Sequence, residues 1–137
     1  MLHELVSEMG YKSAYIAAEQ RNSATFQQTI RRIGLQPNPN MEFYGDMDDP
    51  RLDLRNLRFI FIDSKDSARI TVTDFRKMKE DYPDLTIILT SQSNKDATYR
   101  GDGTWRNEVE VVLKGEMGTI RVDGKNRFGG NGELKVY

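Results

Sequence analysis

The sequence has no cysteine and a single histidine, His3, and these two shortages remove several kinds of chemistry at once. Disulfide frameworks, thiolate zinc sites and cysteine nucleophiles all need a side chain that is missing here. A metal site built from several histidines is excluded, and a serine–histidine triad is disfavoured. Any catalysis by this chain must therefore use carboxylates, amides, lysine or arginine.

The chain also lacks an excess of charge of either sign and a long hydrophobic run. Its 20 Lys and Arg residues against 21 Asp and Glu residues leave a formal net charge of -1, which gives no overall attraction to nucleic acid or to a charged membrane. The longest apolar runs, such as 85–89, are far below the roughly 18 residues that span a bilayer, and Met1 begins no signal peptide. We therefore expect a soluble, cytoplasmic protein without a membrane partner.

The length of 137 residues is enough to bury one hydrophobic core and too short for two ordinary domains, so we predict a single domain over residues 1–137. Three apolar runs are typical of buried strands, and helical spacing of apolar residues separates them. The predicted strands cover 11–18, 57–62 and 85–90. This alternation predicts an α/β fold with a mainly parallel sheet that is covered on both faces.

Local signals place the helices between these strands. The first residues, up to a stop at Gly10, are typical of the end of an amphipathic helix. Asn22 or Ser23 caps a second helix that Gly34 ends, and Thr73 caps a third that Pro83 closes. Residues 35–57 are expected to form a loop with at most one edge strand, and 93–104 a polar loop. Short alternating segments at 108–114, 119–122 and 133–136 predict antiparallel or mixed strands at one edge of the sheet.

Each predicted buried strand ends in a polar residue: Glu19, Asp63 and Gln92. In an open α/β sheet, ligands bind beyond the carboxyl ends of the strands. A carboxylate placed there can hold Mg²⁺ through water, a second can polarise an attacking water, and an amide can sense a phosphate. The other interpretation is that buried strands must end in something polar, although the coincidence of all three favours a site.

Four segments stand in the order and approximate spacing of RecA-like ATPases, and the sequence resembles the RadA/Sms DNA-repair and DnaB-type helicase branch, including its mobile-element versions. The segments are 15–20, 59–64, 90–96 and 125–129, and the Lys-Asn-Arg-Phe-Gly of the last is the most specific. The resemblance covers nearly the whole chain. It implies a RecA-like three-layer fold, ATP and Mg²⁺ as ligands, DNA as a partner and assembly into an oligomer.

The resemblance also implies roles for single residues. Glu19 is similar to the catalytic glutamate that orients water, Asp63 to the Walker B aspartate that supports Mg²⁺, and Gln92 to the sensor amide that couples the γ-phosphate to a DNA-facing loop. Lys125 and Arg127 match cations that in the family can reach the nucleotide of a neighbouring subunit. The alternative for these two is a basic surface turn before Gly129.

The phosphate-binding loop of the family is missing. No G-x-x-x-x-G-K-[ST] occurs, because Gly124-Lys125 is followed by Asn126 and Gly118 lies one residue too far upstream. Without that loop no nest of backbone N–H groups surrounds the phosphates. The resemblance implies that the chain begins just beyond the Walker A lysine and lacks the strand before it. That loss leaves a slot in the sheet after the Gln92 strand, which closes up, is covered by another chain or is filled by upstream residues.

A second candidate surface is the loop from 94 to 105, whose Lys95, Tyr99 and Arg100 could hold single-stranded DNA. Its two aspartates and the neutral overall charge favour a solvated loop instead. We interpret Trp105 as a core or rim anchor. The aspartates at 46, 48 and 49 resemble a calcium loop only superficially and are interpreted as turn residues.

The leading hypothesis is a truncated or degenerate RecA-like ATPase domain of the DNA repair, recombination or helicase lineage that cannot bind and hydrolyse ATP alone. The alternative is a non-catalytic module that caps or regulates an intact RecA-like ATPase or a DNA-bound complex. An enzyme that uses the carboxylates for unrelated chemistry is a third and weaker hypothesis, because no nucleophile is evident.

Overall fold

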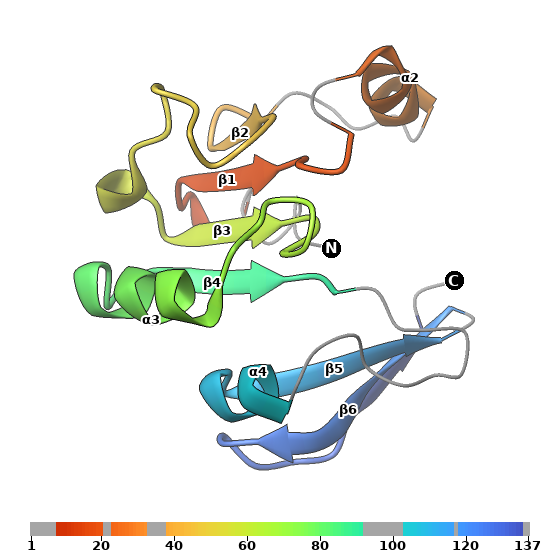
Figure 1. Cartoon of the computed structure of the whole chain (residues 1–137). Helices are drawn as coiled ribbons and strands as arrows, with labels where there is room; N and C mark the ends of the chain where they lie inside the picture. The colour runs from red at the N-terminus through yellow and green to blue at the C-terminus, as the bar shows by residue number, and fades with distance from the viewer. Residues whose placement is uncertain (1–7, 21–22, 33–37, 92–102, 117, 136–137) are drawn as a thin grey trace. The chain divides into compact units, whose positions relative to one another are not determined.

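A computed structural model describes residues 8–20, 23–32, 38–91, 103–116 and 118–135 of the chain (Figure 1). The chain divides into two compact units, residues 1–100 and 101–137, and each is described by itself. None of the described helices has the length and apolar character needed to cross a bilayer.

The first unit contains a four-stranded parallel sheet with the strand order β2-β1-β3-β4. Its strands are β1 (Ser13–Ile16), β2 (Met41–Tyr44), β3 (Phe59–Ile62) and β4 (Thr86–Leu89). Its helices are α2 (Ala24–Arg32), the short 3-10 helix η1 (Leu54–Asn56) and α3 (Val72–Asp81). The three predicted buried strands are thus confirmed, each shorter than its apolar run, and β2 is the single edge strand expected within 35–57.

The buried core lies on one face of this sheet. Ile16, Ile60 and Ile62 have no exposed surface, and Met78 of α3 packs against the cluster that they form. In Figure 1, α3 is drawn in front of the start of β4. Because side chains alternate along a strand, the apolar residues at every second position all point to this covered face. Full burial of one such isoleucine contributes roughly 1.5–3 kcal/mol to folding.

Aromatic side chains occupy the opposite face. The rings of Tyr15 and Phe61 are stacked with their centroids 5.0 Å apart, because β1 and β3 pair in register at these two residues. Phe26 of α2 lies 6.0 Å from Tyr15 and 5.6 Å from Phe43 of β2. This helix therefore covers the aromatic face over β1 and β2, so the first unit has helices on both faces of its parallel sheet, as predicted.

The start of α3 differs from the sequence prediction. Thr71, and not Thr73, is the N-cap, and its hydroxyl oxygen accepts the N–H of Asp74 at 3.1 Å. The Asp74 carboxylate accepts the Thr71 N–H at 2.9 Å in return. Thr73 has no acidic residue three positions further on, whereas Thr71 has one, and this reciprocal capping box decides where the helix begins. The helix ends before Pro83, as expected.

The other predicted helix ends agree with the structure where it describes them. The Ser23 hydroxyl accepts the N–H of Phe26 at 3.2 Å and so caps α2. Asn22 and Gly34, the other residues predicted to bound this helix, lie outside the described residues. Gly10 has a φ of 65°, which suits a glycine just after a helix end.

The second unit begins with α4 (Gly103–Glu108), followed by three antiparallel strands, β5 (Val111–Glu116), β6 (Thr119–Asn126) and β7 (Glu133–Lys135). The antiparallel prediction is confirmed. The strand predicted to start at Glu108 is wrong at its first residues, because Glu108 ends α4, which also takes the last two residues of the predicted polar loop. Trp105 of α4 is buried, in agreement with its interpretation as an anchor.

The two sheets are separate. Among the described strands, β4 pairs only with β3, and β5, β6 and β7 pair only with one another. The parallel and antiparallel strands are thus present as predicted, but the prediction that the C-terminal strands form one edge of the parallel sheet is wrong, because among the described residues they pair only with one another. The specific RecA-like arrangement and the single domain over 1–137 stay predictions.

Candidate functional site

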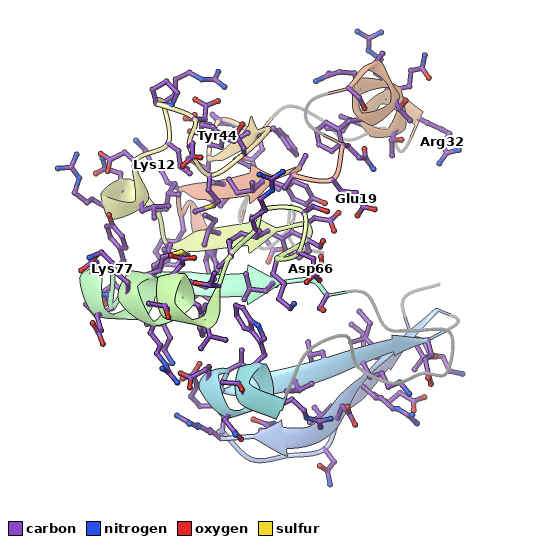
Figure 2. All side chains as sticks on the ribbon, in the orientation of Figure 1. Lys12, Glu19, Arg32, Tyr44, Asp66 and Lys77 are labelled. Atoms are coloured by element: carbon purple, nitrogen blue, oxygen red, sulfur yellow. The ribbon has the colours of Figure 1, made fainter. Side chains whose placement is uncertain are left out.

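Glu19 and Asp63 lie next to each other at the carboxyl edge of the parallel sheet. They follow the neighbouring strands β1 and β3, and the N–H of Glu19 donates to the carbonyl oxygen of Asp63 at 3.1 Å. The N–H of Asp63 in turn donates to the carbonyl oxygen of Ile16 at 3.0 Å. Figure 2 labels Glu19 and also Asp66, which comes three residues after Asp63, and both lie at the same end of the strands. The structure therefore brings together two of the three predicted strand-end residues.

The Asp63 carboxylate is held on both of its oxygens. The Tyr15 hydroxyl of β1 donates to Oδ2 at 2.9 Å, and the Thr90 hydroxyl, one residue after β4, donates to Oδ1 at 2.8 Å. Hydrogen bonds to an ionised acceptor are the stronger kind. Because the three residues come from three adjacent strands, the carboxylate fastens the ends of β1, β3 and β4 to one another. We refer to Tyr15, Asp63 and Thr90 as the Asp63 cluster.

The hydroxyl of Tyr15 is strongly perturbed by this environment. Burial raises the pKa of the Tyr15 phenol well above its ordinary value, and the hydrogen bond to Asp63 and the negative charges of Asp63 and Glu19 raise it further. Each of these causes disfavours the phenolate. Tyr15 therefore stays a hydrogen-bond donor to Asp63 even at alkaline pH, where an ordinary tyrosine begins to lose its proton.

The turn after β3 contains a buried cation that the sequence analysis did not single out. Lys65 is only 4% exposed, and its Nζ lies 2.8 Å from Oδ1 of Asp66. Its backbone N–H donates to the carbonyl oxygen of Thr90 at 3.1 Å, which ties this turn to the Asp63 cluster. Ser64, beside it, is also buried, and its hydroxyl bonds with that of Ser67 at 3.3 Å. The carboxyl edge thus carries a fixed positive charge as well as its acids.

The remaining predicted site residues lie outside the described residues or in the second unit, so the structure does not place them relative to this edge. Gln92, Lys95, Tyr99 and Arg100 lie outside the described residues. Lys125 is in β6 of the second unit, and its side chain also lies outside them.

Arg127 follows β6 in a turn. Its guanidinium is 3.7 Å from a carboxylate oxygen of Glu110, and its N–H donates to the Glu110 carbonyl at 3.0 Å. Its side chain is 57% exposed, which agrees with a basic surface turn and also leaves it accessible to a partner.

Glu19 and Asp63 are suitable acids for a magnesium ion bound through water. An ionised carboxylate offers about four lone-pair sites, so Asp63 keeps acceptor capacity beyond its two hydroxyl partners. Mg²⁺ retains several waters and needs only one or two carboxylates when substrate phosphates supply the rest. Among the residues that the structure describes, no three acidic or histidine side chains gather into a metal site. A phosphate cradle of the Walker A type is lacking in the sequence, so phosphates would need another holder.

Sequence signals explain why Glu19 and Asp63 can be predicted and their neighbours cannot. Both acids end continuous apolar runs, which marks them directly. Tyr15 and Thr90 are inside or beside such runs, and only the strand register reveals that their hydroxyls meet Asp63. Comparisons with protein families, with curated proteins and with solved structures each found no match.

Proposed function

We propose that this chain is a RecA-like ATPase core of the DNA repair, recombination or helicase lineage that has the acidic residues of ATP hydrolysis without a phosphate-binding loop of its own. It does not bind and hydrolyse ATP alone. The observation that carries the proposal is the backbone hydrogen bond between Glu19 and Asp63, at 3.1 Å, which holds two acids at the carboxyl ends of neighbouring parallel strands. Parallel sheets place ligands at this edge.

In this proposal the two acids have different roles. Asp63, held by two hydroxyls, is the fixed acceptor that supports Mg²⁺ through water. Glu19 is exposed and orients the attacking water. The sequence has no G-x-x-x-x-G-K-[ST] loop to hold ATP phosphates, so the acids act only when an intact RecA-like ATPase supplies one. Arg127 acts in trans, as an exposed cation toward the nucleotide of a neighbour.

Two measurements on the purified 137-residue chain test the first half of the proposal. We expect no saturable heat in calorimetric titration with Mg²⁺ and ATP, and no ATP turnover above that of the Glu19→Gln variant. Asp84→Asn is the matched control, because it also neutralises an exposed carboxylate but lies before β4, at the amino end of the sheet. Turnover that disappears in Glu19→Gln and survives in Asp84→Asn would contradict the proposal.

A titration into an active ATPase of the RadA or DnaB type tests the second half. We expect the chain to change the ATP turnover of that enzyme in a saturable way, and Arg127→Gln to reduce the change several-fold. Arg121→Gln is the matched control, because Arg121 is an exposed cation of the same sheet that pairs with Glu116. No effect at any ratio, or an equal effect of both variants, would argue against action in trans.

One observation favours the alternative, a non-catalytic module that caps or regulates such an ATPase or a DNA-bound complex. Three large apolar side chains of the second unit are exposed: Phe128 at 81%, Leu113 at 61% and Leu134 at 47%. Exposed apolar residues of this size are typical of interaction surfaces when they occur together. Co-elution of the chain with the ATPase in gel filtration that persists in Glu19→Gln and is lost in Phe128→Ser favours the alternative over the ATPase core.

A further inference from the structure

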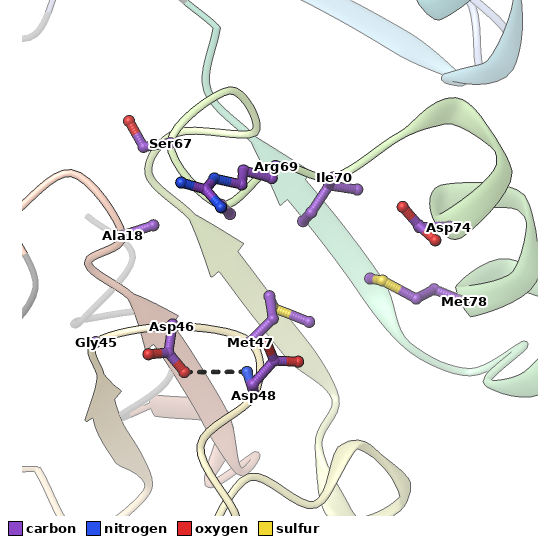
Figure 3. A pocket seen from close by; sticks show the side chains of 11 residues that line it. Ala18, Gly45, Asp46, Met47, Asp48, Ser67, Arg69, Ile70, Asp74 and Met78 are labelled. Carbon is purple, nitrogen blue, oxygen red and sulfur yellow. Dashed lines mark hydrogen bonds between the residues drawn. The ribbon is translucent and has the colours of Figure 1, made fainter.

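A pocket of about 420 Å³ opens on the first unit, between the loop after β2, the turn after β3 and α3 (Figure 3). Residues 45–48 form one wall, 67–70 the opposite wall, and Met78 of α3 lies at the side. This volume is within the range of small-molecule sites. Ala18, the residue before Glu19, lines the pocket, but neither Glu19 nor Asp63 does.

Arg69 presents an exposed cation to this pocket from a turn with a fixed backbone. Its φ is 56°, in the left-handed region that residues with a Cβ rarely adopt. The turn holds it there, because its N–H donates to the carbonyl of Asp66 at 3.2 Å and the next N–H donates to the carbonyl of buried Lys65 at 3.0 Å. No hydrogen bond or ion pair joins its guanidinium to another residue that the structure describes. Figure 3 shows the guanidinium among the lining side chains.

The opposite wall carries two acids, Asp46 and Asp48. Oδ1 of Asp46 accepts the N–H of Asp48 at 3.0 Å, which confirms the turn chemistry predicted from the sequence and fixes the loop (Figure 3). Neither carboxylate forms an ion pair with a residue in the described part of the chain. Asp74 also lines the pocket, but its Oδ2 accepts both the N–H and the hydroxyl of Thr71 in the capping box.

Each of the two charged walls also contributes an apolar side chain, and α3 contributes a third. Met47, Ile70 and Met78 line the pocket, and all three pack against the core cluster of the first unit. A molecule that fits must therefore offer an anion to Arg69, a cation to the two acids and an apolar middle. A guanidinium binds a carboxylate or phosphate through two parallel hydrogen bonds, and a protonated amine donates to carboxylates.

We propose that this pocket binds a small zwitterion, with a carboxylate held by Arg69, a protonated amine held by Asp46 and Asp48, and an apolar chain against Met47 and Ile70. The assignment does not depend on the ATPase proposal, because it uses neither Glu19 nor Asp63. It requires both charged ends, which separates it from a general anion site and from a general cation site.

Three probes of one length test this requirement: 6-aminohexanoate, which has both charges, hexanoate, which has only the anion, and hexylamine, which has only the cation. Each is titrated into the full ¹⁵N-labelled chain, and amide shifts are followed by NMR. We expect saturable shifts for 6-aminohexanoate at residues 45–48 and 67–70, with an affinity at least about tenfold above that of either single-charge probe. Shifts that stay linear in concentration, or hexanoate or hexylamine binding as tightly, would overturn the proposal.

Two variants and one control show which residues bind the carboxylate and which bind the amine of 6-aminohexanoate. Arg69→Asn removes the cation with a residue that tolerates a positive φ, and we expect it to weaken 6-aminohexanoate about tenfold while hexylamine is unchanged. Asp46→Asn with Asp48→Asn is expected to weaken 6-aminohexanoate and leave hexanoate unchanged. Arg31→Gln, on the exposed side of α2, is expected to bind 6-aminohexanoate as the natural chain does. Equal weakening by Arg31→Gln, or none by Arg69→Asn, would refute the assignment.

Discussion

The two units of this chain are stabilised in different ways. In the first unit, isoleucines of neighbouring parallel strands are fully buried beneath α3. In the second unit, Trp105 is the one buried residue among those described, and the strands carry ion pairs such as Lys114–Glu116 at 2.6 Å. Exposed ion pairs contribute little, whereas buried apolar area contributes most of a fold's stability. Among the described residues, the first unit therefore has the larger buried core, and the second leaves more of its apolar side chains exposed.

The largest expected effect is a difference between the two units in how much a truncated apolar side chain lowers the free energy of unfolding. Ile62→Ala removes a side chain with no exposed surface and should lower the free energy of unfolding by about 2–5 kcal/mol. Leu113→Ala, in β5, truncates a side chain that is 61% exposed and should cost less than about 0.5 kcal/mol. Urea unfolding followed by circular dichroism measures both. Similar losses for the two variants would remove the distinction between the units.

The second effect concerns the Asp63 cluster, where the first unit holds its polar groups. Tyr15→Phe and Thr90→Val each remove one hydroxyl donor to a carboxylate, and each should cost about 1.5–3 kcal/mol in urea unfolding. Because both hydroxyls bind the same carboxylate, the double variant should not equal the sum of the single ones. Strict additivity would mean that Asp63 does not couple the two strands.

The third effect depends on pH and concerns the first unit, which contains Tyr15 and Tyr44. The pKa of Tyr15 is raised, and burial together with a hydrogen bond to Glu42 raises the pKa of Tyr44 to about 12. A folded state that keeps its phenol protons while the unfolded state loses them becomes less stable as pH rises above the ordinary tyrosine value of about 10. The stability from these phenols is complete below about pH 10 and is lost above it.

Unfolding midpoints measured from pH 8 to 11.5 test this expectation. We expect a constant midpoint up to about pH 9.5 and a decline beyond it. The decline should be smaller in Tyr15→Phe, since phenylalanine has no proton to lose. An unchanged slope in Tyr15→Phe would assign the alkaline loss to other groups.

The smallest effect tests where α3 begins. Thr71→Ala removes the capping hydroxyl and should cost about 1 kcal/mol. Thr73→Ala, two residues further on, changes an exposed side chain inside the first turn and should be close to neutral. The pair is a matched comparison, because both variants replace the same residue type in one helix. Equal losses of stability in the two variants would support Thr73 as a cap, as the sequence predicts.

The sequence predicts the secondary structure of the first unit well because its signals are local. A continuous apolar run such as Phe59–Ile62 marks a buried strand, and the polar residue that follows marks its carboxyl end. The cap at Thr71 also has a local signal, since Asp74 stands three residues beyond it. The prediction of Thr73 is wrong because it overlooks that acid.

The parts of the site that the sequence could not predict depend on contacts between distant residues. In the sequence, Tyr15 is one more residue of an apolar run. Only the register of β1 and β3 shows that its hydroxyl meets Asp63, which is 48 positions away. Arg69 carries no motif, and its place opposite Asp46 depends on how two loops close around one pocket. The pattern of residue types along a short stretch of sequence does not show which distant residues come into contact.

The edge of β4 has a practical consequence for anyone who prepares this protein. In the described structure this strand pairs with β3 alone, and its Thr-Ile-Ile-Leu sequence contains no charge and no proline. Strand edges of this composition are prone to pair with another molecule. Thr86 is exposed at the start of the strand, so a lysine there would act as a gatekeeper against self-association. We expect Thr86→Lys to extend the concentration range in which the chain can be handled without precipitation.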